Sequence, residues 1–304
     1  MLVSVVMTTY NGSKYIIEQL DSILKQTRKA DEVIILDDAS NDNTVEIIEE
    51  FIKKSNLINW YVIKNVKNVG WRRNFINGFH QAKGDIVFCA DQDDIWYPEK
   101  IEVMSDIMEK NDKISVLASN LEVFWEKDSK RNNYQCIQYG VKELEKVNFD
   151  KMWLEPWRPG CAMAFKRSLL PLIDKVWFEE CAHDLLLWAI GIVRGEAYII
   201  NRVLIHYRRH SNVSTPSNAK NKSTRIGLMR LYDTLSEQII SNKDIFQLSH
   251  DMVEKISAMK NFYRQRESAI KKKDLYELLC LLFSLNLYPK KKSWIADVIS
   301  SYRE

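Results

Sequence analysis

Apolar runs alternate with helical repeats through the first hundred residues. Short apolar runs predict strands over residues 2–7, 32–36, 60–63 and 85–89. Apolar residues spaced three and four apart predict helices over residues 15–25, 44–53 and 72–81. Strands that alternate with helices indicate an α/β fold with a mostly parallel sheet, which residues 115–205 should complete. Runs this continuously apolar are typical of strands that are buried on both faces.

Polar side chains follow each of these four strands. They occupy Thr8–Gly12, Asp37–Asp42, Asn68–Gly70 and Asp91–Asp94. Ligands of open α/β sheets bind at the carboxyl ends of the strands, so these loops predict a ligand site. A single acidic loop can also be the start of a helix, where carboxylates complement the helix dipole. For residues 40–42, ahead of Thr44, both interpretations stay open.

The segment Asp91-Gln92-Asp93-Asp94 carries the most specific chemistry. Three carboxylates in four residues repel one another, so a compact site needs a cation or open water beside them. Carboxylate oxygens are hard ligands that suit Mg²⁺ or Mn²⁺, with phosphates of a substrate completing the coordination. The alternative is a capping loop, because Pro98 suits the first turn of a helix that runs to about Lys110.

Composition places the chain among globular proteins with one large or two ordinary domains. Its 304 residues are 46% hydrophobic and 28% charged, and no stretch is apolar for long enough to span a bilayer. Residues 1–7 lack the pattern of a secretory signal. Five cysteines without C-x-x-C spacing predict buried thiols in a reducing, cytoplasmic compartment. They are Cys89, Cys136, Cys161, Cys181 and Cys280.

Charge divides the chain into an acidic body and a basic tail. Residues 220–304 contain 16 basic and 10 acidic side chains, whereas the whole chain has a net charge of only +3. We therefore expect a catalytic domain over 1–218, with halves at about 1–110 and 111–218, and a helical region over 219–304. Lysine triplets at 271–273 and 290–292 flank an apolar run, 275–288, which predicts an interfacial helix on an anionic membrane. The alternative is a helical subdomain packed on the body or on a second protomer of a homo-oligomer.

In their order and spacing, the motifs resemble those of family 2 glycosyltransferases with the GT-A fold. The likeness is strongest to the bacterial rhamnosyltransferase-like branch that builds cell-surface polysaccharides, and it covers about residues 2–215. The motifs that carry it are residues 4–12, 18–23, 36–42, 68–70, 83–85, 91–96, 183–184 and 207–210. Ala39 stands where the family usually has glycine, and this departure concerns only the conformation of the local turn.

The resemblance also implies roles for individual residues. It makes Asp184 the general base, with helix capping as the alternative role. The implied nucleotide-binding residues are Thr8, Tyr10, Asp38, Arg72, Arg73 and Asp91. The implied ligands of Mn²⁺ or Mg²⁺ are Asp93, Asp91 and His210. The implied acceptor pocket contains Trp157, Gly160, Cys161 and His183. Asp38 would accept the N3–H of a pyrimidine, and the arginines would approach the diphosphate.

The resemblance thus implies inverting, metal-dependent transfer of a sugar to a hydroxyl of a glycan or lipid-linked saccharide. It favours dTDP-L-rhamnose as donor, with a UDP-hexose as the alternative, and it implies no nucleic-acid partner. A dehydrogenase would need G-x-G-x-x-G after the first strand, which residues 8–12 do not contain. A haloacid-dehalogenase-like phosphatase also uses a D-x-D loop, but after its first strand. A non-catalytic glycan-binding scaffold is the remaining alternative, against which the retained acids argue.

Overall fold

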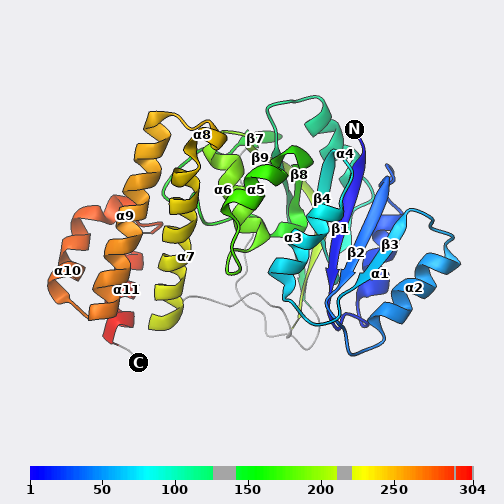
Figure 1. Ribbon diagram of the computed structural model, residues 1–304, viewed down its shortest axis with the longest axis horizontal. Coiled ribbons are helices and arrows are strands. Elements are labelled where there is room, and N and C mark those ends of the chain that lie inside the picture. The colour runs from blue at the N-terminus through cyan, green and yellow to red at the C-terminus, as the bar shows by residue number, and fades with distance from the viewer. Residues whose placement is uncertain (126–141, 211–220, 291, 303–304) are drawn as a thin grey trace. The chain divides into compact units, whose positions relative to one another are not determined.

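A computed structural model describes residues 1–125, 142–210, 221–290 and 292–302 of the chain (Figure 1). The chain forms two compact units. The first contains residues 1–148, 156–171 and 182–213, and the second contains 149–155, 172–181 and 214–304. The boundary that we expected at residue 218 lies outside the described residues, so it stays a prediction.

A nine-stranded sheet forms the centre of the first unit, and its strand order is β3-β2-β1-β4-β8-β6-β9-β5, with β7 paired to β9. The strands are β1 (Val3–Thr9), β2 (Glu32–Asp37), β3 (Trp60–Lys64), β4 (Ile86–Asp91), β5 (Ile95–Trp96), β6 (Val116–Trp125), β7 (Leu144–Lys146), β8 (Met163–Lys166) and β9 (Ala197–Arg209). The first four predicted strands are confirmed and pair in parallel. β8 pairs antiparallel to β4 and β6, so the middle of the chain completes the sheet as expected.

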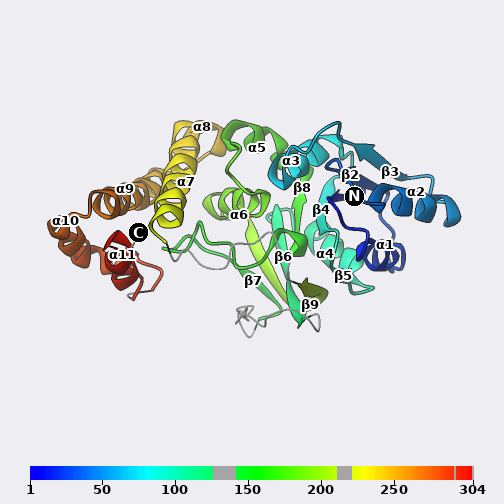
Figure 2. The ribbon, with the colours of Figure 1, turned by 90° about the horizontal axis from the view of Figure 1, so that it is seen from below.

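Helices cover both faces of this sheet (Figure 2). They are α1 (Ile16–Leu24), α2 (Thr44–Lys54), α3 (Trp71–Gln81), α4 (Lys100–Glu109) and α6 (His183–Val193). Of α5 (Leu170–Val176), the first two residues belong to the first unit and the others to the second. Val5 and Met7 of β1 share one core with apolar residues of α1, α2 and α4. On the opposite face, Gly78 of α3 lies directly against Val6. β1, β2 and β4 are buried as expected, whereas the edge strand β3 is half exposed.

The second unit is helical. Its helices are α7 (Lys222–Ser241), α8 (Lys243–Phe246), α9 (His250–Lys272), α10 (Leu275–Cys280), the 3₁₀ segment η3 (Leu281–Leu287) and α11 (Lys292–Tyr302). A buried carboxylate, Asp297, connects α7, α9 and α11, because it pairs with Arg225 at 2.6 Å and with Arg266 at 2.8 Å. No helix in the described part of the chain is long and apolar enough to cross a membrane.

Two expectations need correction here. The run 275–288 is not one helix, because α10 passes into η3 and the backbone leaves helical geometry at Ser284 (φ −109°, ψ 20°). Cys89, Cys161 and Cys181 are buried thiols as expected, but Cys280 is exposed. Cys136 lies outside the described residues.

Candidate active site

The polar strand ends meet at one edge of the sheet. In the parallel register, Thr8 lies opposite Asp91 and Thr9 lies opposite Asp37, although the pairs are far apart in the sequence. Thr8 is nearly buried, whereas Tyr10 in the following loop is 43% exposed. This register is the physical basis for a common site, because it sets the loops after β1, β2 and β4 side by side.

Asp38 orders the approach to α3. Its carboxylate is buried and accepts hydrogen bonds from the backbone N–H groups of Val69 and Gly70, both at 2.8 Å, and from the Asn65 side chain at 2.9 Å. Partners among the described residues therefore occupy three of about four lone-pair positions. The adjacent Ala39 has φ +61°, a left-handed conformation that costs alanine more than it would cost glycine.

Gln92 connects residues 91–94, the predicted metal-binding loop (here the metal loop), to the loop after β1. Its side-chain oxygen accepts from Tyr10 N–H at 2.8 Å, and its Nε2 donates to Tyr10 O at 3.1 Å. A Cβ at Gly12 would lie 2.2 Å from Gln92 Oε1, so glycine leaves room for this contact. The sequence did not predict a role for Gln92, because its partner Tyr10 lies in a distant loop and only the neighbouring acids have an evident chemistry.

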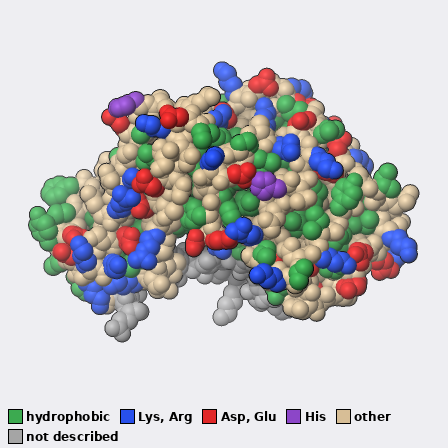
Figure 3. All heavy atoms as spheres, viewed as in Figure 1, with side chains coloured by type: hydrophobic (Ala, Val, Ile, Leu, Met, Phe, Trp, Pro, Cys, Tyr) green, Lys and Arg blue, Asp and Glu red, His purple; other side chains and the backbone are tan. Residues whose placement is uncertain are grey.

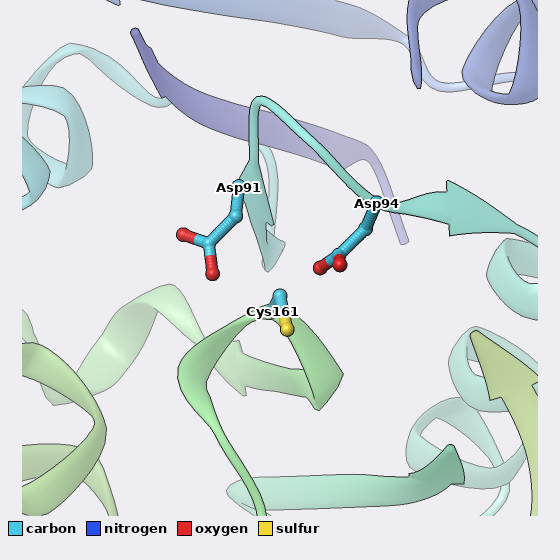
Figure 4. A group of neighbouring side chains, drawn as sticks. All are labelled: Asp91, Asp94 and Cys161. Carbon is cyan, nitrogen blue, oxygen red and sulfur yellow. The ribbon is translucent and has the colours of Figure 1, made fainter. Parts of the chain in front are cut away.

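Asp91, Asp94 and Cys161 are neighbours, and they lie on β4, in the turn before β5 and in the 3₁₀ turn η1 (Gly160–Ala162) (Figure 4). One ligand atom from each lies within 4.8 Å of the others. Burial raises the pKa of Asp91 and of Asp94, and the neighbouring carboxylates add to this, while the Cys161 thiol opposes it. Asp94 Oδ1 accepts from Arg208 N–H at 3.0 Å, and its Oδ2 has no hydrogen-bond partner among the described residues.

Asp93 turns in another direction and meets His210. His210 Nε2 lies 2.7 Å from Asp93 Oδ2, and the His210 ring stacks on Tyr15 at 4.8 Å. Arg208 donates to the backbone oxygen of Asp93 at 2.7 Å, which connects the end of β9 to the metal loop. Two of the three predicted metal ligands are thus in contact, and the third, Asp91, interacts electrostatically with Asp93. Residues 211–220 lie outside the described part of the chain.

These residues fit a hard divalent cation. Asp91 and Asp93 offer carboxylate oxygens, which are the ligands that suit Mn²⁺ and Mg²⁺, and His210 adds an imidazole nitrogen. The geometric group that contains Cys161 is less suitable, because thiolate favours softer metals and because Asp94 and Cys161 are fully buried. We therefore regard Asp94 as the link between this loop and β9.

Asp184 is the second residue of α6 and does not cap the helix, because the capping position is Ala182. Its Oδ1 accepts from Leu185 N–H at 2.7 Å. Burial raises the pKa of Asp184, while the Leu185 N–H and the charge of Arg72 oppose this rise. Asp184 is also close enough to Asp91 to raise the pKa of that carboxyl. The predicted base and the metal loop thus share one site.

Arg72 and Arg73 lie at the start of α3, next to the loop that Asp38 orders. The Arg72 guanidinium lies 4.4 Å from the centre of the Trp71 ring. Both arginines are half-buried. Arg72 thus lies within the electrostatic range of Asp184, a proximity that the sequence did not predict.

Of the four residues expected around the acceptor, Gly160 and His183 are in direct contact, whereas Trp157 packs elsewhere. His183 is buried and stacks on Phe75 at 3.7 Å, and burial lowers its pKa to about 3, so the imidazole is neutral. Gly160 lies directly against His183, since a Cβ there would approach Nε2 to 2.0 Å. Cys161 is fully buried beside the carboxylates, whereas Trp157 is half-buried and packs on Trp188 at 5.6 Å.

Lys100 is a further residue that sequence reasoning missed. It is fully buried, and its ammonium donates to Cys161 O at 2.6 Å. Burial lowers the pKa of Lys100 to about 7, and the charges of Asp94 and Asp91 oppose this effect. The available signal was its position just after the metal loop, but a lysine in the first turn of a helix is ordinarily exposed.

A parallel half-sheet with acids at its strand ends and a separate, half-buried acid is the arrangement of a nucleotide-sugar transferase of the GT-A type. The sequence matches the glycosyl transferase family 2 domain over residues 4–172, so the chain belongs to glycosyltransferase family 2. This membership excludes the phosphatase and the non-catalytic scaffold.

Two relatives extend the match beyond that domain. The chain is 31% identical over 239 residues to the dTDP-rhamnosyl transferase RfbG of Shigella flexneri, which covers 74% of this chain and 79% of the relative. It is 35% identical over 238 residues to an uncharacterised glycosyltransferase of Methanocaldococcus jannaschii, which covers 76% of each chain.

Solved structures share the fold at lower sequence identity. S. aureus TarS in complex with UDP has a TM-score of 0.61 at 17% identity, covering 99% of this chain and 89% of that one. The mannosyltransferase PcManGT of Pyrobaculum calidifontis, in complex with GDP-Man and Mn²⁺, has a TM-score of 0.55 at 18% identity, covering 98% and 85%. At these identities the likeness supports the GT-A fold alone.

Proposed function

We propose that this glycosyltransferase transfers a sugar, with inversion at the anomeric carbon, from a nucleoside diphosphate donor to a glycan hydroxyl. The observation that carries this proposal is the proximity of one separate, half-buried acid, Asp184, to the acidic loop that ends β4. An acceptor oxygen would attack C1 of the sugar while the C1–oxygen bond to the diphosphate breaks. Asp184 would take the hydroxyl proton, and its raised pKa suits a base that works near neutral pH.

The donor would lie along the strand ends. Thr8, Tyr10 and the remaining lone pair of Asp38 would contact the nucleoside, and Arg72 and Arg73 would approach the diphosphate. Asp91, Asp93 and His210 would hold Mn²⁺ or Mg²⁺. The ion would supply positive charge to the leaving diphosphate.

The acceptor would bind near Trp157 and Gly160. The buried His183 and Cys161 would support this surface from beneath rather than contact the sugar, because neither side chain is exposed. The acceptor would be a glycan or a lipid-linked saccharide of cell-surface polysaccharide synthesis.

The donor sugar is the finer part of the proposal. Similarity to RfbG, named a dTDP-rhamnosyl transferase, favours dTDP-L-rhamnose, and a UDP-hexose is the alternative. Thymine and uracil present the same N3–H group, so Asp38 suits both. Calorimetric titration with dTDP, UDP and GDP in the presence of Mn²⁺ should show binding of a pyrimidine nucleotide. Tight GDP binding without pyrimidine binding would contradict this donor assignment.

The substitution Asp184→Asn tests the base. Transfer should fall by about 10²–10⁴-fold, because an amide cannot accept the proton, while nucleotide affinity stays nearly unchanged. Asp112→Asn is the matched control, since the Asp112 side chain is 95% exposed. Initial rates with radiolabelled donor and calorimetry with the nucleotide measure the two quantities. Wild-type turnover by Asp184→Asn would refute the assignment.

We also propose that the second unit contacts the cytoplasmic face of an anionic membrane. Leu275, Leu279 and Phe283 are exposed at near-helical spacing on α10 and η3, as are Ile295, Ile299 and Tyr302 on α11. Hydrogen bonds from Trp294 to Leu278 O (2.7 Å) and from Tyr302 to Lys273 O (3.2 Å) hold these segments side by side. Figure 3 shows apolar side chains gathered over α10 with basic side chains nearby.

Charge favours a membrane over a second protomer at this surface. Lys271, Lys273, Lys290 and Lys292 are exposed around it, and two such copies would repel each other. Flotation with anionic liposomes should show binding that weakens with salt, and Phe283→Ser with Leu279→Ser should abolish it. Binding that is unchanged by this pair of substitutions would refute the proposed surface. A salt-stable dimer would favour the protomer instead.

A further inference from the structure

One polar face of α1 contacts the chain just after the metal loop. Glu18, Ser22 and Gln26 recur every four residues, so they share one side of this helix and of the turn that ends it. Ser22 Oγ accepts from Trp96 N–H at 3.1 Å, and the Gln26 side chain donates to Tyr97 O at 2.7 Å. This face of α1 therefore supports the segment into which the metal loop continues.

Glu18 extends the same face to the end of β9. Its carboxylate accepts from Arg208 Nη2 at 2.7 Å, and the Glu18 side chain is 54% exposed whereas that of Arg208 is only 7% exposed. The guanidinium lies 4.9 Å from the centre of the Tyr15 ring and 4.6 Å from the centre of the Phe124 ring. A guanidinium that contacts aromatic rings and donates to a carboxylate is restricted in direction. Glu18 and the two rings thus fix the Arg208 side chain.

Arg208 in turn holds the metal loop. Its Nε donates to the backbone oxygen of Asp93 at 2.7 Å, and its backbone N–H donates to Asp94 Oδ1 at 3.0 Å. The ring of Tyr15, the residue before α1, stacks on His210 at 4.8 Å, and His210 Nε2 lies 2.7 Å from Asp93 Oδ2. Two of the proposed metal ligands, Asp93 and His210, are therefore oriented by groups at the start of α1.

We propose that Glu18 is a positioning residue for the divalent ion, because it fixes Arg208 and thereby the orientation of Asp93. Glu18 also offsets the positive charge of Arg208, which would otherwise weaken the attraction of a cation to the metal loop. It acts without contacting the ion or the substrate. This inference rests on the metal-dependent function proposed above. Groups that orient metal ligands change metal affinity by about 10–100-fold when they are removed.

Three substitutions test this role. Glu18→Gln keeps the size of the side chain and removes its charge, whereas Glu18→Asp keeps the charge at a shorter reach. Asp21→Asn is the matched control, because Asp21 lies on the same helix and forms an exposed ion pair with Lys25 at 2.5 Å. Mn²⁺ binding is measured by electron paramagnetic resonance in the presence of UDP or dTDP. Initial rates are measured over a range of Mn²⁺ concentrations, and thermal melting without metal checks that each variant folds.

Glu18→Gln should bind Mn²⁺ about 10-fold more weakly than the wild type, Glu18→Asp should lie between the two, and Asp21→Asn should match the wild type. Excess Mn²⁺ should restore the turnover of Glu18→Gln, because the substitution weakens metal binding and leaves the proposed base unchanged. In an Arg208→Met background, Glu18→Gln should have a much smaller effect on Mn²⁺ affinity. If Arg208→Met does not fold, the comparison of Glu18→Gln with Asp21→Asn still decides.

The outcomes separate this inference from the proposed function. Wild-type Mn²⁺ affinity in Glu18→Gln would overturn the role of Glu18, and so would an equal loss of affinity in Asp21→Asn. An undiminished effect of Glu18→Gln in the Arg208→Met background would overturn the route through Arg208. No Mn²⁺ binding by the wild type with either UDP or dTDP would instead refute the metal-dependent function.

Discussion

Gly160→Ala should impair turnover through the residue next to the proposed base. A Cβ at position 160 would lie 2.0 Å from Nε2 of His183 and within 2.9 Å of two further ring carbons. The ring cannot easily withdraw, because it stacks on Phe75 at 3.7 Å and has Trp71 and Phe79 within 6.1 Å. Overpacking of this kind costs about 1–3 kcal/mol of stability.

The same clash should reach the chemistry, because His183 and Asp184 are consecutive residues at the start of α6. A shift of about 1 Å in a reacting group can cost on the order of 10²-fold in rate. We therefore expect kcat to fall about 10²-fold while the affinity for UDP or dTDP changes little. Urea unfolding, initial rates and calorimetry measure the three quantities.

Two controls make this prediction specific. Gly227→Ala, in an open position on α7, should leave kcat unchanged and add up to about 1 kcal/mol of stability. His183→Ala removes the clashing ring, so Gly160→Ala should cost much less stability in that background. An equal cost in both backgrounds, or wild-type kcat in Gly160→Ala, would refute the reasoning.

Further predictions concern charge. Because burial raises the pKa of Asp184, kcat/KM should fall as pH decreases through that raised value, and a pH–rate profile measures this. A carboxyl whose pKa is raised on folding destabilises the folded state as pH rises above the pKa of the unfolded chain. The free energy of unfolding of Asp184→Asn, relative to that of the wild type, should therefore be higher at pH 8 than at pH 4, as urea unfolding would show. Asp297→Asn should cost about 3–5 kcal/mol in urea unfolding, because it leaves the buried Arg266 and the half-buried Arg225 without a carboxylate. Asp251→Asn, which removes only an exposed pair, should change stability by less than about 0.5 kcal/mol.

Local pattern explains why much of the first unit was predictable. The strands and helices up to residue 91 carry their own periodicity, and burial of both sheet faces gives continuous apolar runs such as residues 86–90 of β4. The polar loops were predictable for the same reason, because they interrupt apolar runs at each strand end. The break at Ser284 was not predictable from periodicity, since the apolar pattern continues across it.

The sequence by itself determined the α/β order, the acidic loop and, through resemblance, the separate acid Asp184. Only the tertiary structure decided which partner each acid of the loop contacts. Asp93 turns to His210 while Asp94 turns inward to Arg208, and one-residue spacing cannot distinguish them. The structure likewise places Lys100 behind the loop and Gly160 against His183. Such contacts join segments many residues apart, and their energies depend on distance and burial, which a linear pattern does not contain.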